Sequence, residues 1–200
     1  NDYVQIKYKC NGTGTLYDYS LFPGINLIFM DFNCSDIFHE PIPNKNIIEI
    51  RHYQKGRVEF ELRNNKVFHM KEGELCINAL ANVPAAYSFP FGYSVGLSCV
   101  IDKDSIDAKT KQIFSYYNID VLNLGQELEI EKKWFLCRTP QRLLHIFDEL
   151  YAAKGVEGKD YFRIKLLELF YHIKQLRIED QYEACLLYTS PSPRDLSTSR

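Results

Sequence analysis

The stretch that decides the fold is Ile47-Ile48-Glu49-Ile50-Arg51-His52-Tyr53-Gln54-Lys55-Gly56-Arg57, with the five residues that follow it. Residues 47–53 are rich in isoleucine and predict one strand, while residues 58–62 alternate apolar and acidic side chains and predict another. Gly56 accepts the positive φ of a tight turn, so we expect a hairpin turn at Lys55-Gly56. Further strands are predicted at 25–30, 67–70, 73–77 and 93–101. Many short strands with closely spaced turns indicate an antiparallel barrel or sandwich.

Glu49 stands seven positions before Gly56, and this spacing resembles the second half of the first cupin motif. The first half, a His-x-His, should fall at 42–45, where the residues are Ile, Pro, Asn and Lys. The histidine of the second cupin motif is also missing, since residues 78–89 contain none. No two of the five histidines stand at metal-binding spacing, and zinc or iron needs three or four convergent ligands. The resemblance therefore implies a cupin-like barrel, and we expect no metal and no cofactor.

Glu49, Arg51 and Tyr53 share one face of their predicted strand. The Glu of the cupin motif points into the barrel, so by resemblance all three side chains face its interior. There they could hydrogen-bond a small polar ligand such as a sugar or an acid. Two alternatives remain open: an internal network that satisfies itself, or a flattened barrel whose strand face meets solvent. The further candidates for ligand binding are Glu59, Tyr87 and Tyr93.

The pattern after residue 103 changes from strands to helices. We expect a first helix at 104–117 and a second that is capped by Thr139, begins at Pro140 and stops at Gly155. Its predicted buried stripe is Leu143, Ile146, Phe147 and Leu150.

A third helix is predicted from a cap at Asp160 to about residue 178. It has two apolar faces, and one of them repeats in alternating steps of four and three, as a coiled-coil seam does. We assign this seam to a partner subunit, so that the chain forms a homodimer; the alternative is a helix covered entirely by its own chain. The predicted dimerisation residues are Phe162, Leu166, Leu169, Ile173 and Leu176, with Ile164, Leu167 and Tyr171 on the opposite face.

The composition fits one compact domain with a helical appendage, because 46% of the 200 residues are apolar. We divide the chain into a cupin-like sensor barrel at 1–120 and a helical dimerisation region at 121–184. A formal net charge of −2 argues against a nucleic-acid-binding surface. No apolar run approaches the ~20 residues that span a bilayer, so no membrane contact is expected. None of the six cysteines forms a C-x-x-C pair, which indicates free thiols and a cytoplasmic protein.

Residues 185–200 are expected to be a disordered tail that is not native to the protein. Residues 186–195, Leu-Leu-Tyr-Thr-Ser-Pro-Ser-Pro-Arg-Asp, match the translation of a transposase adapter used in sequencing libraries. The alternative is an ordinary Ser/Pro-rich disordered tail. On the first interpretation the natural chain continues past about Ala184.

The order of several motifs resembles AraC-type transcriptional regulators, in particular a branch found in gut Firmicutes. The resemblance to their cupin sensor half lies in residues 24–29, 53–59 and 72–75, and more specifically in Ser-Phe-Pro-Phe-Gly-Tyr-Ser-Val-Gly-Leu at 88–97 with 100–102. Residues 138–143 with 146–151, and residues 161–169, resemble the two helices of the dimerisation region.

This resemblance implies a bacterial ligand-sensing and dimerisation region rather than an enzyme. It implies a small polar effector as partner, and contact with DNA only through a C-terminal helix-turn-helix domain that this sequence does not contain. Two rivals remain: a metal-dependent cupin enzyme such as a sugar isomerase or dioxygenase, and a structural barrel without a ligand. No Ser-x-x-Lys, Gly-x-Ser-x-Gly or phosphate-binding glycine loop is present.

Overall fold

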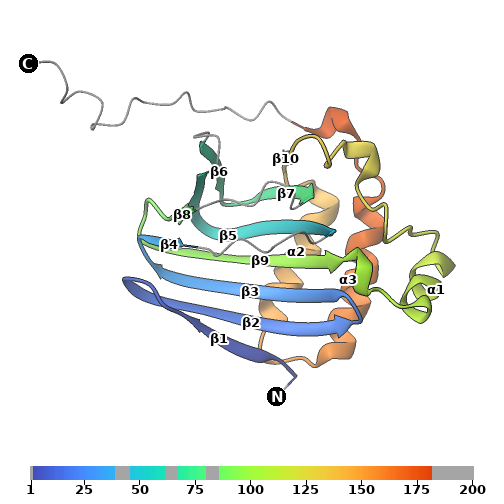
Figure 1. Ribbon diagram of the computed structural model, residues 1–200, viewed down its shortest axis with the longest axis horizontal. Coiled ribbons are helices and arrows are strands. Elements are labelled where there is room, and N and C mark those ends of the chain that lie inside the picture. Colours follow the sequence, from blue (N-terminus) through green and yellow to red (C-terminus); the bar gives the residue numbers. More distant parts are fainter. Residues whose placement is uncertain (1, 39–45, 62–66, 80–85, 182–200) are drawn as a thin grey trace, which may run out of the picture.

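A computed structural model describes residues 2–38, 46–61, 67–79 and 86–181 (Figure 1). The predicted tail and positions 42–45 therefore lie outside the described residues. The strands are β1 (Val4–Tyr8), β2 (Gly12–Phe22), β3 (Ile25–Cys34), β4 (Asp36–Phe38), β5 (Ile47–Glu61), β6 (Val67–Lys71), β7 (Glu74–Ala79), β8 (Ala86–Ser88), β9 (Ser94–Asp102) and β10 (Phe135–Arg138). The α-helices are α1 (Ala108–Tyr116), α2 (Gln141–Ala153) and α3 (Lys159–Ile173), and short 3-10 turns lie at Lys103–Ser105, Gln126–Leu128 and Ile178–Asp180.

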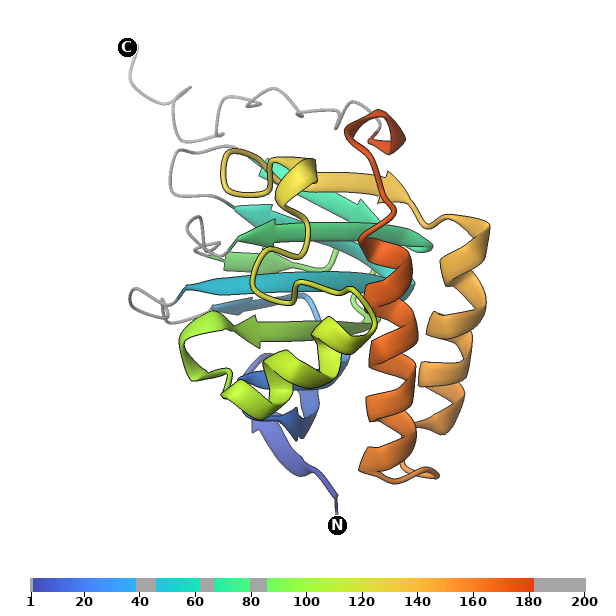
Figure 2. The ribbon, with the colours of Figure 1, turned by 90° about the vertical axis from the view of Figure 1, so that its right-hand side faces the viewer.

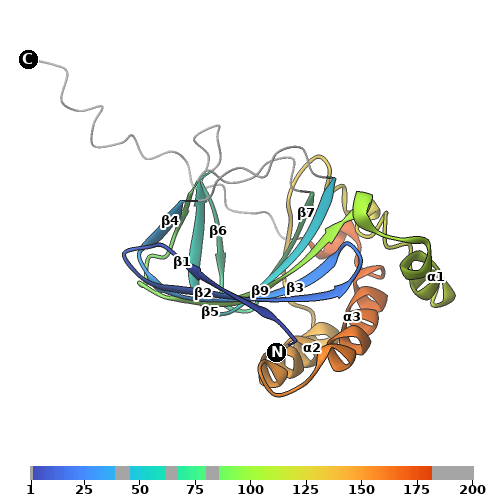
Figure 3. The ribbon, with the colours of Figure 1, turned by 60° about the horizontal axis from the view of Figure 1, so that its bottom comes forward.

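The strands form one curved, antiparallel sheet. Seven of them run in the order β1-β2-β3-β9-β5-β7-β10, and β6, β8 and β4 continue the sheet from the second half of β5. Seen end-on, the sheet bends into an open trough, with β4 and β6 on one wall and β7 on the other (Figure 3). The helices α2 and α3 lie on the outside of this trough, beside each other (Figures 2 and 3). The predicted fold class, a cupin-like β domain followed by helices, is confirmed, with the sheet open.

The strand β5 is the element on which the site is built. It is one continuous strand of 15 residues that pairs with β9 and β7 along its first half and with β6 and β8 along its second. The predicted hairpin turn at Lys55-Gly56 is therefore wrong, because a β-bulge between Tyr53 and Lys55 takes its place. Gly56 has a φ of 87°, and a Cβ there would lie 2.5 Å from the Tyr93 carbonyl oxygen, so only glycine fits.

The two faces of β5 enter two different hydrophobic cores. Ile48 and Ile50 face the larger core, which lies between the sheet and the helices. Tyr53, Val58 and Phe60 face the smaller core inside the trough. The larger core also takes in residues from both predicted parts of the chain, and β10, from within the part predicted as helical, pairs with β7.

The helix α2 confirms the predicted buried stripe, but it starts differently. Pro140 is its N-cap residue and no side chain caps the helix, so the predicted cap at Thr139 is wrong. Similarly, α3 follows Gly158 and no side chain caps it; Asp160 lies inside the first turn, where it pairs with Arg163 at 2.6 Å. The helix ends at Ile173, earlier than predicted.

The two apolar faces of α3 point in the opposite directions from those predicted: the seam assigned to a partner subunit turns inward. All five predicted dimerisation residues, Phe162, Leu166, Leu169, Ile173 and Leu176, are at most 1% exposed and belong to the larger core. The Phe162 ring, for example, lies 4.7 Å from Tyr19 on β2 and 5.8 Å from Phe29 on β3, centroid to centroid. The opposite face carries Ile164 and Tyr171, which are 63% and 45% exposed. The predicted seam therefore lies in the subunit's own larger core and is not available to a partner.

Candidate functional site

A cavity of about 190 Å³ lies inside the trough, opposite the helices. Its wall is almost entirely hydrophobic and comes from β1, β2, β3, β4, β5, β8 and β9 and from the turn after β8. The lining residues are Tyr8, Leu16, Ile28, Met30, Phe32, Ile37, Glu49, Arg51, Tyr53, Tyr87, Phe89, Ser98 and Val100. Alternation along the strands explains this set, because every second side chain of a strand faces the interior.

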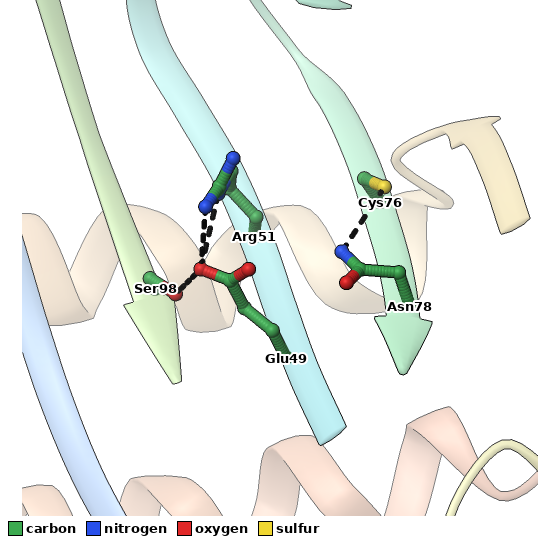
Figure 4. Close-up of polar contacts among 5 residues, drawn as sticks. All are labelled: Glu49, Arg51, Cys76, Asn78 and Ser98. Atoms are coloured by element: carbon green, nitrogen blue, oxygen red, sulfur yellow. Dashed lines mark hydrogen bonds and ion pairs between the residues drawn. The ribbon is translucent and has the colours of Figure 1, made fainter. Parts of the chain in front are cut away.

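A buried ion pair supplies the charge in this wall. Arg51 donates to one carboxylate oxygen of Glu49, Oε1, from Nη2 at 2.6 Å and from Nε at 3.2 Å. Ser98, on the neighbouring strand β9, donates its hydroxyl to the same oxygen at 2.5 Å (Figure 4). Glu49 and Arg51 are only 4% and 5% exposed. A pair so far from water is stable only where hydrogen bonds satisfy most of its polar atoms.

Two polar atoms of this pair are left over. Glu49 Oε2 and Arg51 Nη1 are buried and have no hydrogen-bond partner among the described residues. The three hydrogen bonds from Arg51 and Ser98 all converge on Oε1, which leaves Oε2 without a donor among the described residues (Figure 4). Buried polar atoms without a partner are uncommon in folded proteins and call for an explanation at each site.

The electrostatics keep Arg51 charged and the tyrosines neutral. Burial is the largest single influence and would lower the pKa of Arg51, but Glu49, Tyr53 and Tyr87 together outweigh it and the pKa is raised. The guanidinium also lies over the rings of Phe60 and Tyr87, at 5.0 and 5.5 Å from their centroids. Burial raises the pKa of Tyr53 and of Tyr87, so both phenols remain protonated and can donate a hydrogen bond.

The predicted candidates divide into two groups in the structure. Glu49, Arg51, Tyr53 and Tyr87 all line the cavity. This excludes the alternative in which the strand face meets solvent, and the unpaired Glu49 oxygen leaves the self-satisfied network incomplete.

Glu59 and Tyr93 do not belong to the site. Glu59 pairs with Arg57 at 2.9 Å near the surface, and Tyr93 is 44% exposed. The bulge explains Glu59, because one extra residue reverses which side chains face inward: odd-numbered residues before it, even-numbered residues after it.

Sequence reasoning missed Ser98 and Asn78. The register places Asn78, on β7, directly opposite Glu49, and its amide approaches Cys76 Sγ at 3.9 Å (Figure 4). The amide oxygen of Asn78 is buried without a partner among the described residues. Neither residue stands in a motif, and only the pairing of β9 and β7 with β5 could have pointed to them.

The structure offers no metal centre within the described ranges, since nowhere in them do three or more His, Cys, Asp or Glu side chains gather. His52 lies on the opposite face of β5 from the cavity. Its ring stacks on Phe147 of α2 at 4.1 Å, and its Nδ1 lies 3.1 Å from the Tyr151 hydroxyl. Burial lowers the pKa of His52 to about 4, so the ring is neutral at physiological pH.

Comparison with known proteins gives a fold and no close relative. No family model matches the chain, and no curated protein matches it. Among solved structures, the AraC-like transcriptional activator CuxR matches 82% of this chain with a TM-score of 0.50 and 7% identity. The chain therefore shares its fold with the matched part of CuxR. At this identity the likeness concerns the fold alone, and the chain spans 55% of the length of CuxR.

Two further solved structures are similar over part of the chain. ToxT from Vibrio cholerae O395 matches 78% of this chain and 56% of its own, at a TM-score of 0.45 and 8% identity. The EutQ protein of Clostridium difficile matches 48% of this chain and 66% of its own, at a TM-score of 0.36 and 14% identity.

Among the described residues, no helix combines the length and the apolar character that a membrane span requires.

Proposed function

We propose that this chain is the ligand-sensing part of an AraC-like transcriptional regulator, with its effector bound in the cavity of the trough. The observation that carries the proposal is the free Glu49 oxygen, Oε2, which is buried beside a hydrophobic cavity. A ligand that donates a hydrogen bond to this oxygen would satisfy it. The shared fold with CuxR supports the regulator class.

The chemistry of the wall favours an apolar ligand that carries one hydroxyl group. Glu49 Oε2 needs a donor, and Arg51 Nη1 needs an acceptor, and a single hydroxyl supplies both. A carboxylate is less suitable, because Arg51 is already paired and a second anion would be repelled by Glu49. A sugar is also less suitable, since most of its hydroxyls would meet hydrocarbon. A cavity of ~150 Å³ is known to take benzene, so about 190 Å³ suits a molecule the size of a substituted phenol.

The position of β5 suggests how occupancy could reach the helices. Glu49 and Arg51 face the cavity, while their neighbour His52 stacks on Phe147 and bonds with Tyr151 on α2. A ligand that favours one position of β5 would also favour one position of α2, which is a population shift between two states. Contact with DNA would then belong to a helix-turn-helix domain of a longer protein.

We also propose that the regulator is a homodimer in which the outer face of α3 meets the partner. Ile164 and Tyr171 are exposed apolar residues of this helix. Their face takes the place of the predicted seam as the surface that meets the partner. Sedimentation of the wild type and of Ile164→Glu tests this, and a wild type that is monomeric at tens of micromolar contradicts it.

The binding test uses p-cresol as a probe. We expect it to raise the melting temperature of the wild type and to bind in calorimetry. Val100→Trp should abolish binding by filling the cavity, and Glu49→Gln should weaken it, since the variant amide presents a different pattern of donors and acceptors. The matched control is Glu59→Gln, on the same strand but near the surface, which should bind as the wild type does.

The opposite results are equally informative. If p-cresol and a panel of small phenols, alcohols and acids all fail to bind the folded protein, the structural barrel without a ligand is the better interpretation. If binding survives Val100→Trp unchanged, the ligand occupies another site.

A further inference from the structure

Two cysteines from separate strands meet at one end of the trough. Cys10 lies in the connection between β1 and β2 and is half-buried, whereas Cys34 is the last residue of β3 and is buried. Cys10 packs against the smaller core, of which Cys34 is a member. The strand β2 runs between β1 and β3, so the side chains of β1 and β3 would ordinarily be kept apart.

Glycines on β2 remove that barrier. Gly14 pairs with Tyr8 on one side and with Phe32 on the other, and the two rings contact each other across it at 5.8 Å. A Cβ at Gly14 would lie 2.8 Å from the Phe32 ring and 3.0 Å from the Tyr8 Cβ, so only glycine allows this contact.

The same arrangement repeats at Gly12. Gly12 pairs with Cys34, and a Cβ at Gly12 would lie 3.0 Å from the Cys34 Cβ. The Gly12 amide donates to the Cys10 carbonyl at 3.0 Å, which folds the chain tightly back at this point. As a result Cys10 and Cys34 lie on either side of this glycine, at the edge of the same hydrophobic core. The Cys10 thiol is close enough to Cys34 to influence its pKa.

The surroundings give the two thiols different roles. Burial, and then the neighbouring Cys10 thiol, raise the pKa of Cys34 to about 12, so Cys34 stays protonated and unreactive by itself. Cys10 is the more accessible of the two. An oxidant from solvent would therefore reach Cys10 first, with Cys34 placed to react second.

We propose that Cys10 and Cys34 are a thiol modification site at which a peroxide forms a reversible disulfide. The Cys10 thiolate attacks one peroxide oxygen, the O–O bond breaks, and hydroxide leaves, so that Cys10 becomes a sulfenic acid. The Cys34 sulfur then attacks the Cys10 sulfur; the S–O bond breaks, and the departing hydroxide takes the Cys34 proton as water. Overall two thiols lose two electrons, and hydrogen peroxide is reduced to water.

The bridge would join the connection after β1 to the end of β3. Tyr8 and Phe32, two residues before each cysteine, are both part of the cavity wall. Oxidation would therefore hold this wall in one arrangement.

The test is peptide mapping of the reduced full chain after exposure to a modest excess of hydrogen peroxide. Free thiols are alkylated, and the protein is cut with chymotrypsin, which can cleave between the two cysteines at Tyr17 or Phe29. We expect a Cys10–Cys34 cross-linked peptide that dithiothreitol abolishes, while the fully buried Cys76 is recovered as an alkylated thiol. In Cys34→Ala, dimedone should trap a sulfenic acid at Cys10.

The proposal is overturned if the folded wild type accumulates sulfenic or sulfinic acid at Cys10 with no link to Cys34. It is also overturned if the link forms only in urea, because the folded geometry would then not bring the sulfurs together. The wild-type measurement decides the matter even if a cysteine variant fails to fold.

Discussion

Arg51→Ala removes the cation from the buried pair and leaves its carboxylate in place. In the wild type, Glu49 accepts from Arg51 at 2.6 and 3.2 Å, and both residues are at most 5% exposed. After truncation, Ser98 is the one donor to the carboxylate that remains among the described residues. An uncompensated buried charge of this kind costs about 3–5 kcal/mol of the free energy of unfolding.

The assay is urea unfolding followed by circular dichroism. With a slope of about 2 kcal/mol per molar urea, the expected loss lowers the midpoint by roughly 1.5–2.5 M. The matched control is Arg57→Ala, on the same strand, whose 2.9 Å pair with Glu59 involves side chains that are 34% and 29% exposed. Such a partly solvated pair contributes about 0–1 kcal/mol, so the control should barely move the midpoint.

A loss no larger than that of Arg57→Ala, with an unchanged slope, would refute the reasoning, because Glu49 would then be reaching water. A double variant separates charge from packing. In Glu49→Gln with Arg51→Met neither charge remains, and we expect much of the stability to return. A double variant as unstable as Arg51→Ala would instead attribute the loss to packing.

Three more predictions concern His52, the helix α3 and metal binding. Burial lowers the pKa of His52 from 6.5 to about 4, so between these pH values the unfolded chain binds a proton that the folded chain does not. The free energy of unfolding should therefore fall by up to about 3 kcal/mol as the pH drops from about 6.5 to about 4. In acid titrations of stability, His52→Gln should reduce this dependence on pH. Leu169→Ala should lower the free energy of unfolding by about 2–5 kcal/mol in urea, and Leu169→Glu should unfold the chain rather than dissociate a dimer. The control Ile164→Ala, at a side chain that is 63% exposed, should change the free energy of unfolding by less than about 0.5 kcal/mol. Dialysed protein should hold no stoichiometric iron, zinc or manganese, and chelation should leave the melting temperature unchanged; one equivalent of retained metal would contradict this.

The strands and the main helix stripe could be predicted because their signals are local. The alternation of residues 58–62, the apolar character of the first half of β5, and the spacing of Leu143, Ile146, Phe147 and Leu150 depend on neighbours along the chain. The spacing of Glu49 and Gly56 indicated a cupin-like fold. It also placed Arg51 and Tyr53 beside Glu49 on the face of the strand that lines the cavity.

The sequence did not predict in the same way which side chains after Gly56 point into the trough. A glycine after a polar pair suits a hairpin turn and a bulge equally well in a single sequence. Pairing with β9 selects the bulge, and the bulge turns Glu59 outward and Phe60 inward.

The local sequence therefore determined the strands β3, β6, β7 and β9 and the helices α2 and α3, and the tertiary structure decided which of their faces meet. On α3 both faces are apolar, and it is contact with the sheet, such as that of Phe162 with Tyr19 and Phe29, that distinguishes the buried face from the exposed one. Ser98 joins Glu49 only because β9 lies next to β5. A periodic pattern shows which side chains share one face of a helix or strand, but which face is buried depends on contacts between residues far apart in the chain.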